Sequence, residues 1–269
     1  MWIECRKIWH KKRVWSVLLV LFIFQIGLFM YSIEQKKTQW EMWNASAYET
    51  EYIRVEKEYV SAFHDNMQDI VSQADFMGTI SIFSQTNSFS NRNLLQTEED
   101  FIDLLDITPM VIESPFLKEF FLNDMIHFVV VAVGIGMAYI LIEEKKQGLR
   151  AMLFSTPNGR GNFVLYKVLA LFVSTGIVTI LFYGGFLVAS SILFDGNLWE
   201  CWGYPVQSLS VFGKLSWNIN MGNFLLVYIL GQWMVVFWIA FFVWMLLFCI
   251  DNLLISVGMA GMAGMLSYI

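Results

Sequence analysis

The stretch from Ile142 to Lys167 reads IEEKKQGLRAMLFSTPNGRGNFVLYK and lies between two of the most hydrophobic segments of the chain. The residues before it, 125–142, and after it, 168–194, contain no Asp, Glu, Lys or Arg. Because a helix rises about 1.5 Å per residue, roughly 20 apolar residues cross a hydrocarbon core about 30 Å thick. The charged stretch is therefore predicted to be a loop that joins two membrane-spanning helices.

The composition of the whole chain also indicates a membrane protein. Of its 269 residues, 57% are hydrophobic and only 15% are charged, so a soluble domain could not cover its surface with polar groups. Uncharged runs occupy residues 14–33, 125–142, 168–194, 215–250 and 252–269. They are too long and continuous for barrel strands, and helices satisfy their own backbone groups in lipid. The sequence predicts an all-α polytopic membrane protein with five visible transmembrane helices.

The N-terminal run has the basic start and apolar centre of a signal peptide, but it favours an uncleaved anchor. The apolar run is longer than the usual hydrophobic region of a signal peptide, and the small-residue segment 44–47 is separated from it by polar residues. Tryptophans and basic residues alternate before the run. That pattern is typical of a helix lying on an anionic membrane surface, or of ordinary flanking anchors.

Charge predicts the orientation of the spans. Residues 1–13 and the stretch 143–167 carry an excess of Lys and Arg, whereas 34–124 holds 17 acidic and 6 basic residues. Positive loops stay in the cytoplasm. We therefore expect the N-terminus and the stretch after the second span inside, and the acidic segment outside.

Together these patterns predict nine segments. They are a cytoplasmic amphipathic interfacial helix (1–13), a first span (14–33), an extracellular helical domain (34–123), a second span (124–142), a cytoplasmic elbow (143–162), a third span (163–194), an extracellular loop (195–220), a fourth span (221–250) and an incomplete fifth span (252–269). Because the chain stops within its last apolar run, we expect it to be a piece of something longer.

The segment 34–123 contains two stretches with helical periodicity. Apolar residues recur at three- and four-residue steps at Tyr48, Tyr52, Val55, Tyr59, Phe63, Met67, Ile70 and Ala74, and again at Phe101, Leu104, Leu105 and Ile107. Such faces usually pack on a partner helix, which favours a small helical domain or hairpin over a ligand-binding segment. In the loop 195–220, an aromatic belt at the membrane surface is favoured over a substrate-stacking role for Trp199, Trp202, Tyr204 and Trp217.

Small residues in two spans predict close helix packing. The second span contains Ala132, Gly134, Gly136 and Ala138, and the fifth contains Ser256, Ala260 and Gly264. Small side chains let helices approach closely in a membrane, within one chain or across a dimer.

The sequence contains no motif of a common enzyme class. It lacks a G-x-x-x-x-G-K-[ST] phosphate loop, H-E-x-x-H, C-x-x-C and G-x-S-x-G, and its three cysteines form no metal pattern. His127 lies near Asp124 at the outer end of the second span, where an interfacial role is favoured over proton or ion handling. Gln25, Gln232, Ser174 and Thr175 could line a path, but bonds between helices are favoured. No catalytic residue, metal or cofactor is predicted.

The elbow has the properties of a docking surface. Glu143 to Phe154 can continue the second span as a helix, followed by a helix stop and start at Ser155-Thr156-Pro157 and a turn at Asn158–Gly161. An apolar face in the cytosol would be left against water unless something covers it. The predicted docking residues are Leu149, Arg150, Met152, Leu153, Phe154, Ser155, Thr156, Pro157 and Arg160.

An acidic-basic cluster, a glycine, a leucine and the sequence STP..R before a lysine resemble the membrane subunit of type-2 ABC transporters. The matching residues are Glu143, Glu144, Gly148, Leu153, Ser155, Thr156, Pro157, Arg160 and Lys167. The basic N-terminus and the external domain after the first span also fit this family, whose members typically have six spans.

The resemblance implies a bacterial inner-membrane exporter permease that does no chemistry itself. Its implied partners are a separate ABC ATPase that binds ATP and Mg²⁺, a second permease subunit and the lipid bilayer; no nucleic acid is expected. The transported substrate is not implied. The alternatives are a non-transporting immunity or sensor protein and, less favoured because polar residues do not converge in the sequence, an intramembrane enzyme.

Overall fold

The structure is a computed structural model that describes residues 2–43, 48–82, 89–112, 116–122, 124–142, 159–193, 198–249 and 258. Within these ranges the chain is helical and forms no strand, as the all-α prediction requires. The chain divides into two compact units. The first comprises residues 1–32, 123–189 and 228–269, and the second comprises 33–122 and 190–227. Each unit is described by itself.

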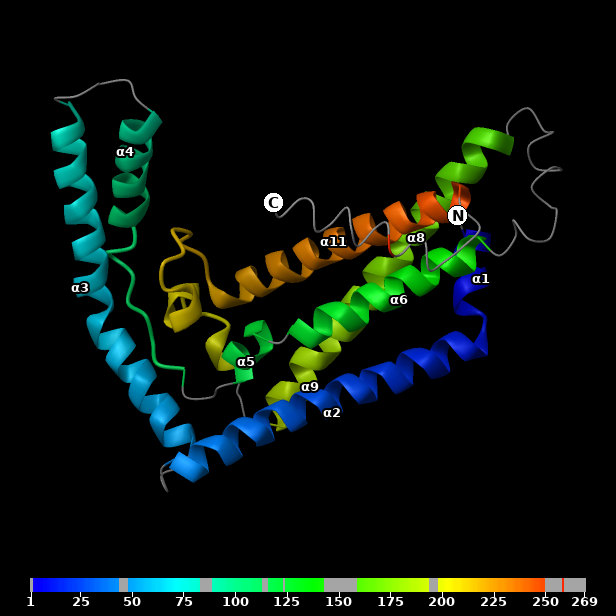
Figure 1. Ribbon diagram of the computed structural model, residues 1–269, viewed down its shortest axis with the longest axis horizontal. Coiled ribbons are helices and arrows are strands. Elements are labelled where there is room, and N and C mark those ends of the chain that lie inside the picture. Colours follow the sequence, from blue (N-terminus) through cyan, green and yellow to red (C-terminus); the bar gives the residue numbers. More distant parts are fainter. Residues whose placement is uncertain are drawn as a thin grey trace. The chain divides into compact units, whose positions relative to one another are not determined.

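The first unit contains the apolar helices. They are α1 (Trp2–Trp9), α2 (Lys12–Trp43), α6 (Asp124–Ile142), α8 (Gly159–Thr179), the π-helical turn η2 (Ile180–Gly184), α9 (Gly185–Leu193) and α11 (Met221–Cys249), with α2 and α11 continuing into the second unit (Figure 1). Val14–Tyr31, Val164–Ala189 and Met221–Cys249 are long and apolar enough to cross a membrane, and Ile126–Ile142 is a shorter apolar helix. The fifth predicted span, 252–269, lies outside the described residues apart from Gly258.

The helices α6 and α8 lie side by side and form the centre of the first unit (Figure 1). Their buried side chains include Ile126, Val130, Met137, Ala170 and Leu171, each at most 2% exposed. In lipid, this contact depends on close packing, because hydrocarbon outside the protein is as apolar as the interior. Both helices are therefore held by shape more than by removal of apolar surface from water.

One small residue of α6 brings α11 close. A Cβ added at Gly134 would lie 2.9 Å from Val236 Cγ1 of α11 and 3.6 Å from Ala240 Cβ. α11 also contacts α8, because the Trp233 indole of α11 donates a hydrogen bond of 3.0 Å to the carbonyl of Phe172 in α8. The packing role predicted for Gly134 is thus confirmed, and its partner helix belongs to the same chain.

Two aromatic pairs attach α2 to the other helices of this unit. Phe22 and Phe182 meet edge to face with ring centroids 5.8 Å apart, and Phe29 and Phe186 do so at 4.6 Å. Elsewhere α2 presents a largely exposed apolar surface that includes Val17, Leu19, Val20, Ile23 and Phe24.

The second unit contains a helical hairpin. Its helices are α3 (Tyr48–Ile82), α4 (Phe89–Ile102), α5 (Phe116–Leu122) and α10 (Leu198–Cys201), with 3-10 turns η3 (Val206–Ser208) and η4 (Ser210–Phe212). α3 packs on α4 (Figure 1). Phe63, Met67, Leu104 and Ile107 form its core, with Tyr59, Ile70, Phe101 and Leu105 against them. The predicted apolar faces are therefore used for packing.

One turn of α3 departs from the predicted pattern. Val55 is 40% exposed, whereas its neighbour Glu56 is fully buried. Lys118 of α5 donates a hydrogen bond of 2.8 Å to Glu56 Oε1 and another of 3.0 Å to Ser210 Oγ. Ser210 in turn donates to the same carboxylate oxygen at 2.9 Å. A buried charge must be paired, and this three-residue network replaces the apolar contact expected at this turn.

The segment 198–220 packs into this helical unit, which the sequence did not predict. Tyr59 donates a hydrogen bond of 2.7 Å to the carbonyl of Gln207, and the Met110 amide donates to Ser208 Oγ at 3.0 Å. The side-chain amide of Gln207 donates hydrogen bonds to the carbonyls of Leu215 and Trp217, and these bonds connect the two ends of the loop. Trp199 and Trp217 stay exposed, so the aromatic-belt role remains a prediction.

Candidate functional site

The described helices fix both ends of the predicted elbow. α6 ends at Ile142 and α8 begins at Gly159, and these two helices pack side by side. The predicted elbow therefore connects two helices that pack against each other.

A buried lysine ties the two helices together near this end. Lys167 is 4% exposed and donates a hydrogen bond from Nζ to the carbonyl of Leu141, in the last turn of α6. The last carbonyls of a helix lack intrahelical partners and carry partial negative charge, so an ammonium group is well placed there. In the sequence, Lys167 stands out only as the lysine of the motif before the third span, and spacing alone does not indicate its partner.

The N-terminal helix packs on the same pair of helices. α1 contacts both α6 and α8, and it buries Cys5 and Ile8, which lie on one face at three-residue spacing. Within the segment 1–13, where the sequence predicts an interfacial helix, α1 covers Trp2–Trp9 and α2 begins at Lys12. α1 is held by protein contacts, which an isolated interfacial helix would lack.

Most of the predicted docking residues lie outside the described part of the chain. These are Leu149, Arg150, Met152, Leu153, Phe154, Ser155, Thr156 and Pro157. Arg160 lies in the first turn of α8. The turn predicted at Asn158–Gly161 is wrong for its described residues, because Gly159, Arg160 and Gly161 are helical. A helical glycine costs only about 1 kcal/mol, which the apolar residues that follow offset by packing.

A cluster of polar side chains joins three helical segments of the first unit. His127 of α6 makes a hydrogen bond through Nδ1 to the hydroxyl of Tyr183 in η2. The hydroxyl of Tyr228 in α11 lies 3.3 Å from His127 Nε2, and the Tyr183 hydroxyl donates to Gln232 Oε1 at 3.4 Å. One proton arrangement satisfies all four groups: Nδ1 donates to Tyr183, and Nε2 accepts from Tyr228.

The cluster was only partly predicted. His127 and Gln232 were singled out as polar groups in spans, and Gln232 does bond a neighbouring helix. The two tyrosines were not singled out, since a tyrosine in an apolar run gives no sign of its partner. The π turn positions Tyr183, and such turns are frequent at functional sites. The prediction that polar residues do not converge is thus wrong at this place.

The other polar candidates do not join this cluster. Thr175 donates to the carbonyl of Phe172 in its own helix at 3.0 Å. Ser174 and Gln25 are buried, and within the described structure their side chains have no hydrogen-bond partner. In the same part of the chain, no group of three or more His, Cys, Asp or Glu side chains could hold a metal ion.

Comparison with known proteins identifies the family. The family described as ABC-2 family transporter protein matches residues 1–257. No curated protein and no solved structure matches significantly. The match covers nearly the whole chain, including the helices that frame the elbow, and members of this family are transport components without catalysis of their own. The chain therefore belongs to the ABC-2 transporter family, as a multi-pass membrane permease component.

Proposed function

We propose that this permease couples ATP hydrolysis in a separate ABC ATPase to export across a bacterial inner membrane. Residues 149–160 dock on the ATPase, the N-terminus lies in the cytoplasm, and a second permease subunit completes the transport path. ATP and Mg²⁺ are bound by the ATPase. The proposal is supported by the family match, by the distribution of charged residues along the sequence, and by the packing of α6 on α8 at the two ends of the elbow.

The hydrogen bond from Lys167 to the Leu141 carbonyl carries the mechanical part of the proposal. It joins α6 to α8 beside the two points where the elbow begins and ends. A push on the elbow is therefore transmitted to both helices together, and α1 moves with them because it packs on both. Such a rigid group can act as one element of a two-state transition.

At the far end of α6, the cluster of His127, Tyr183 and Tyr228 links the same helices to α11. A displacement of α6 and α8 against α11 must rearrange these hydrogen bonds. We propose that the cluster holds one of the two transport states.

The test is ATPase association after charge reversal in the elbow. The permease is expressed together with an ABC ATPase of the same organism, purified, and assayed for bound ATPase and for ATP hydrolysis. We expect the variant Arg150→Glu/Arg160→Glu to lose most of the bound ATPase. The matched control is Arg92→Glu/Lys214→Glu, which reverses two exposed charges in segments predicted to be extracellular. ATPase association that survives deletion of residues 145–160 would overturn the assignment of the docking site.

A further inference from the structure

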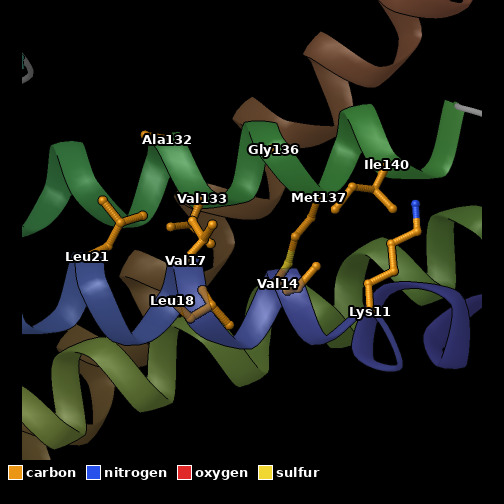
Figure 2. Close-up of a pocket in the computed structure, with 10 residues that line it drawn as sticks. All are labelled: Lys11, Val14, Val17, Leu18, Leu21, Ala132, Val133, Gly136, Met137 and Ile140. Atoms are coloured by element: carbon orange, nitrogen blue, oxygen red, sulfur yellow. The ribbon is translucent and has the colours of Figure 1, made fainter.

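Two apolar grooves run along neighbouring faces of the N-terminal half of α2, and Leu18 lines both. The first lies between α2 and α6 and has a volume of about 380 Å³ (Figure 2). Val14 and Leu18 of α2 line one wall, and Val133, Gly136 and Met137 of α6 line the other. Lys11 lies at the end of this groove, with its amine beside Ile140 (Figure 2).

The second groove lies between α2 and the segment that contains η2 and α9. Its volume is about 610 Å³, and its walls include Leu19, Leu181 and Gly185. Here the basic residue is Lys12, and Trp15 and Ser16 line the groove one turn further along α2. Both grooves are thus apolar along their length and have one lysine at the end where α2 begins.

We propose that each groove binds an acyl chain of an anionic phospholipid, whose headgroup phosphate contacts Lys11 in one groove and Lys12 in the other. Lipids of one leaflet all present their headgroups at the same depth, which explains why both grooves carry a cation at the same end. The aliphatic part of a lysine can lie along apolar surface while its amine reaches a phosphate. Trp15 is 51% exposed, and indole rings favour this depth of the bilayer.

The surrounding charge favours an anionic lipid over a zwitterionic one. Both lysines belong to the basic segment 1–13, which carries five basic residues and one acidic residue. The small residues Ala132 and Gly136 would also admit a helix of a second subunit into the first groove. A helix in the first groove would not explain why the second groove also ends at a lysine.

The test is native mass spectrometry of the purified chain in detergent with phosphatidylglycerol or phosphatidylcholine of identical acyl chains. We expect the wild-type protein to retain phosphatidylglycerol in preference to phosphatidylcholine. Lys11→Gln should weaken phosphatidylglycerol binding about fivefold, because one basic residue near an anionic surface contributes about 1 kcal/mol. Lys12→Gln should act equally, and neither variant should change the retention of phosphatidylcholine. Equal retention of the two lipids by the wild-type protein would overturn the proposal.

A second pair of variants tests the groove itself. A Cβ at Gly136 meets no atom within 4 Å, so the side chain of Gly136→Leu can enter the first groove without displacing a neighbour. Gly27→Leu is the matched control, since Gly27 lies in α2 with equally open space and lines neither groove.

Gly136→Leu should retain one phosphatidylglycerol fewer per chain than Gly27→Leu. Equal lipid retention by the two variants contradicts the proposal. A change in oligomeric mass with an unchanged lipid count would assign the first groove to a contact between subunits. That result would also overturn the lipid proposal. The two lysine variants test the proposal even if a leucine variant fails to fold. Lipid binding is independent of ATPase docking, so the failure of one proposal leaves the other standing.

Discussion

Lys167, buried in α8, donates a hydrogen bond to the carbonyl of Leu141 in the last turn of α6. This bond joins the two helices at the ends of the elbow. Its loss should therefore lower the stability of the protein and weaken the proposed coupling to ATP hydrolysis. Lys167→Met keeps the length of the side chain but removes the donor. We expect it to lower the free energy of unfolding by about 1–2 kcal/mol.

Under the proposed coupling, the same variant should also reduce ATP hydrolysis by the complex with the ATPase more than it reduces ATPase binding, because the proposed docking residues are untouched. Thermal unfolding in detergent and assays on the purified complex measure the two effects. Unchanged stability together with unchanged hydrolysis would contradict the role of this bond.

Gly134 and Gly136 allow a matched test of how α6 packs. A Cβ at Gly134 would lie 2.9 Å from Val236 Cγ1, whereas a Cβ at Gly136 meets open space. We expect Gly134→Ala to destabilise the protein by about 1–3 kcal/mol through overpacking against α11. Gly136→Ala, two residues away in the same helix, should be neutral or slightly stabilising, because alanine is the better helix former. Equal melting temperatures for the two variants would show that α11 does not pack on α6 as described.

The ion pair between Lys118 and Glu56 should contribute far more than the neighbouring surface pair. Glu56 is fully buried and the Lys118 side chain is 23% exposed, whereas the side chains of Arg54 and Glu58 are 62% and 73% exposed. Removing one partner of a buried pair costs about 3–5 kcal/mol, and an exposed pair contributes at most about 1 kcal/mol. Lys118→Met should therefore destabilise the second unit strongly, and Arg54→Met only slightly.

A double variant separates the interaction energy between Glu56 and Lys118 from the effect of replacing each side chain alone. Glu56→Leu/Lys118→Met should be less destabilised than the sum of the two single changes, because it leaves no unpaired buried charge. Denaturant unfolding of the four proteins provides the comparison. Strict additivity would show that the two side chains do not interact.

Tyr59 gives the second unit a pH dependence at high pH. Burial, and then the negative charge of Glu56, raise the pKa of the Tyr59 phenol from 10.0 to about 12. Between pH 10 and 12 the unfolded chain releases a proton that the folded chain keeps, so the stability contributed by neutral Tyr59 is lost as the pH rises through this window. Wild-type protein should lose more stability than Tyr59→Phe between pH 9 and 11.5. Parallel losses, measured by denaturant unfolding at each pH, would contradict the raised pKa.

The bounds of the described apolar helices follow from the sequence more closely than the contacts between these helices do. The range of α6 equals that of the second predicted span, because charged residues bracket an apolar run of about the length that a membrane requires. The first predicted span, 14–33, ends where charged residues begin, whereas the helix α2 continues to Trp43. Charge marks the edge of the hydrocarbon, and a helix need not stop there.

The polar networks could not be predicted, because their members are far apart in the chain. His127 and Tyr183 are 56 positions apart, and Glu56 and Ser210 are 154 apart. Their meeting depends on the rotation of each helix about its axis and, for Tyr183, on one extra residue in a π turn. The elbow and its docking role are predicted from composition and motif alone; the structure describes the helices on either side, α6, which ends at Ile142, and α8, which begins at Gly159.

The proposed coupling requires the elbow to face the cytoplasm, and labelling of a cysteine at position 158 measures this most directly. Cys5, Cys201 and Cys249 are first replaced by serine, after which Asn158→Cys and, as a control on the opposite side, Lys214→Cys are introduced singly. With a membrane-impermeant maleimide, we expect Asn158→Cys to be labelled only after cells are permeabilised, and Lys214→Cys to be labelled in intact cells. Labelling of Asn158→Cys from outside intact cells would contradict the account.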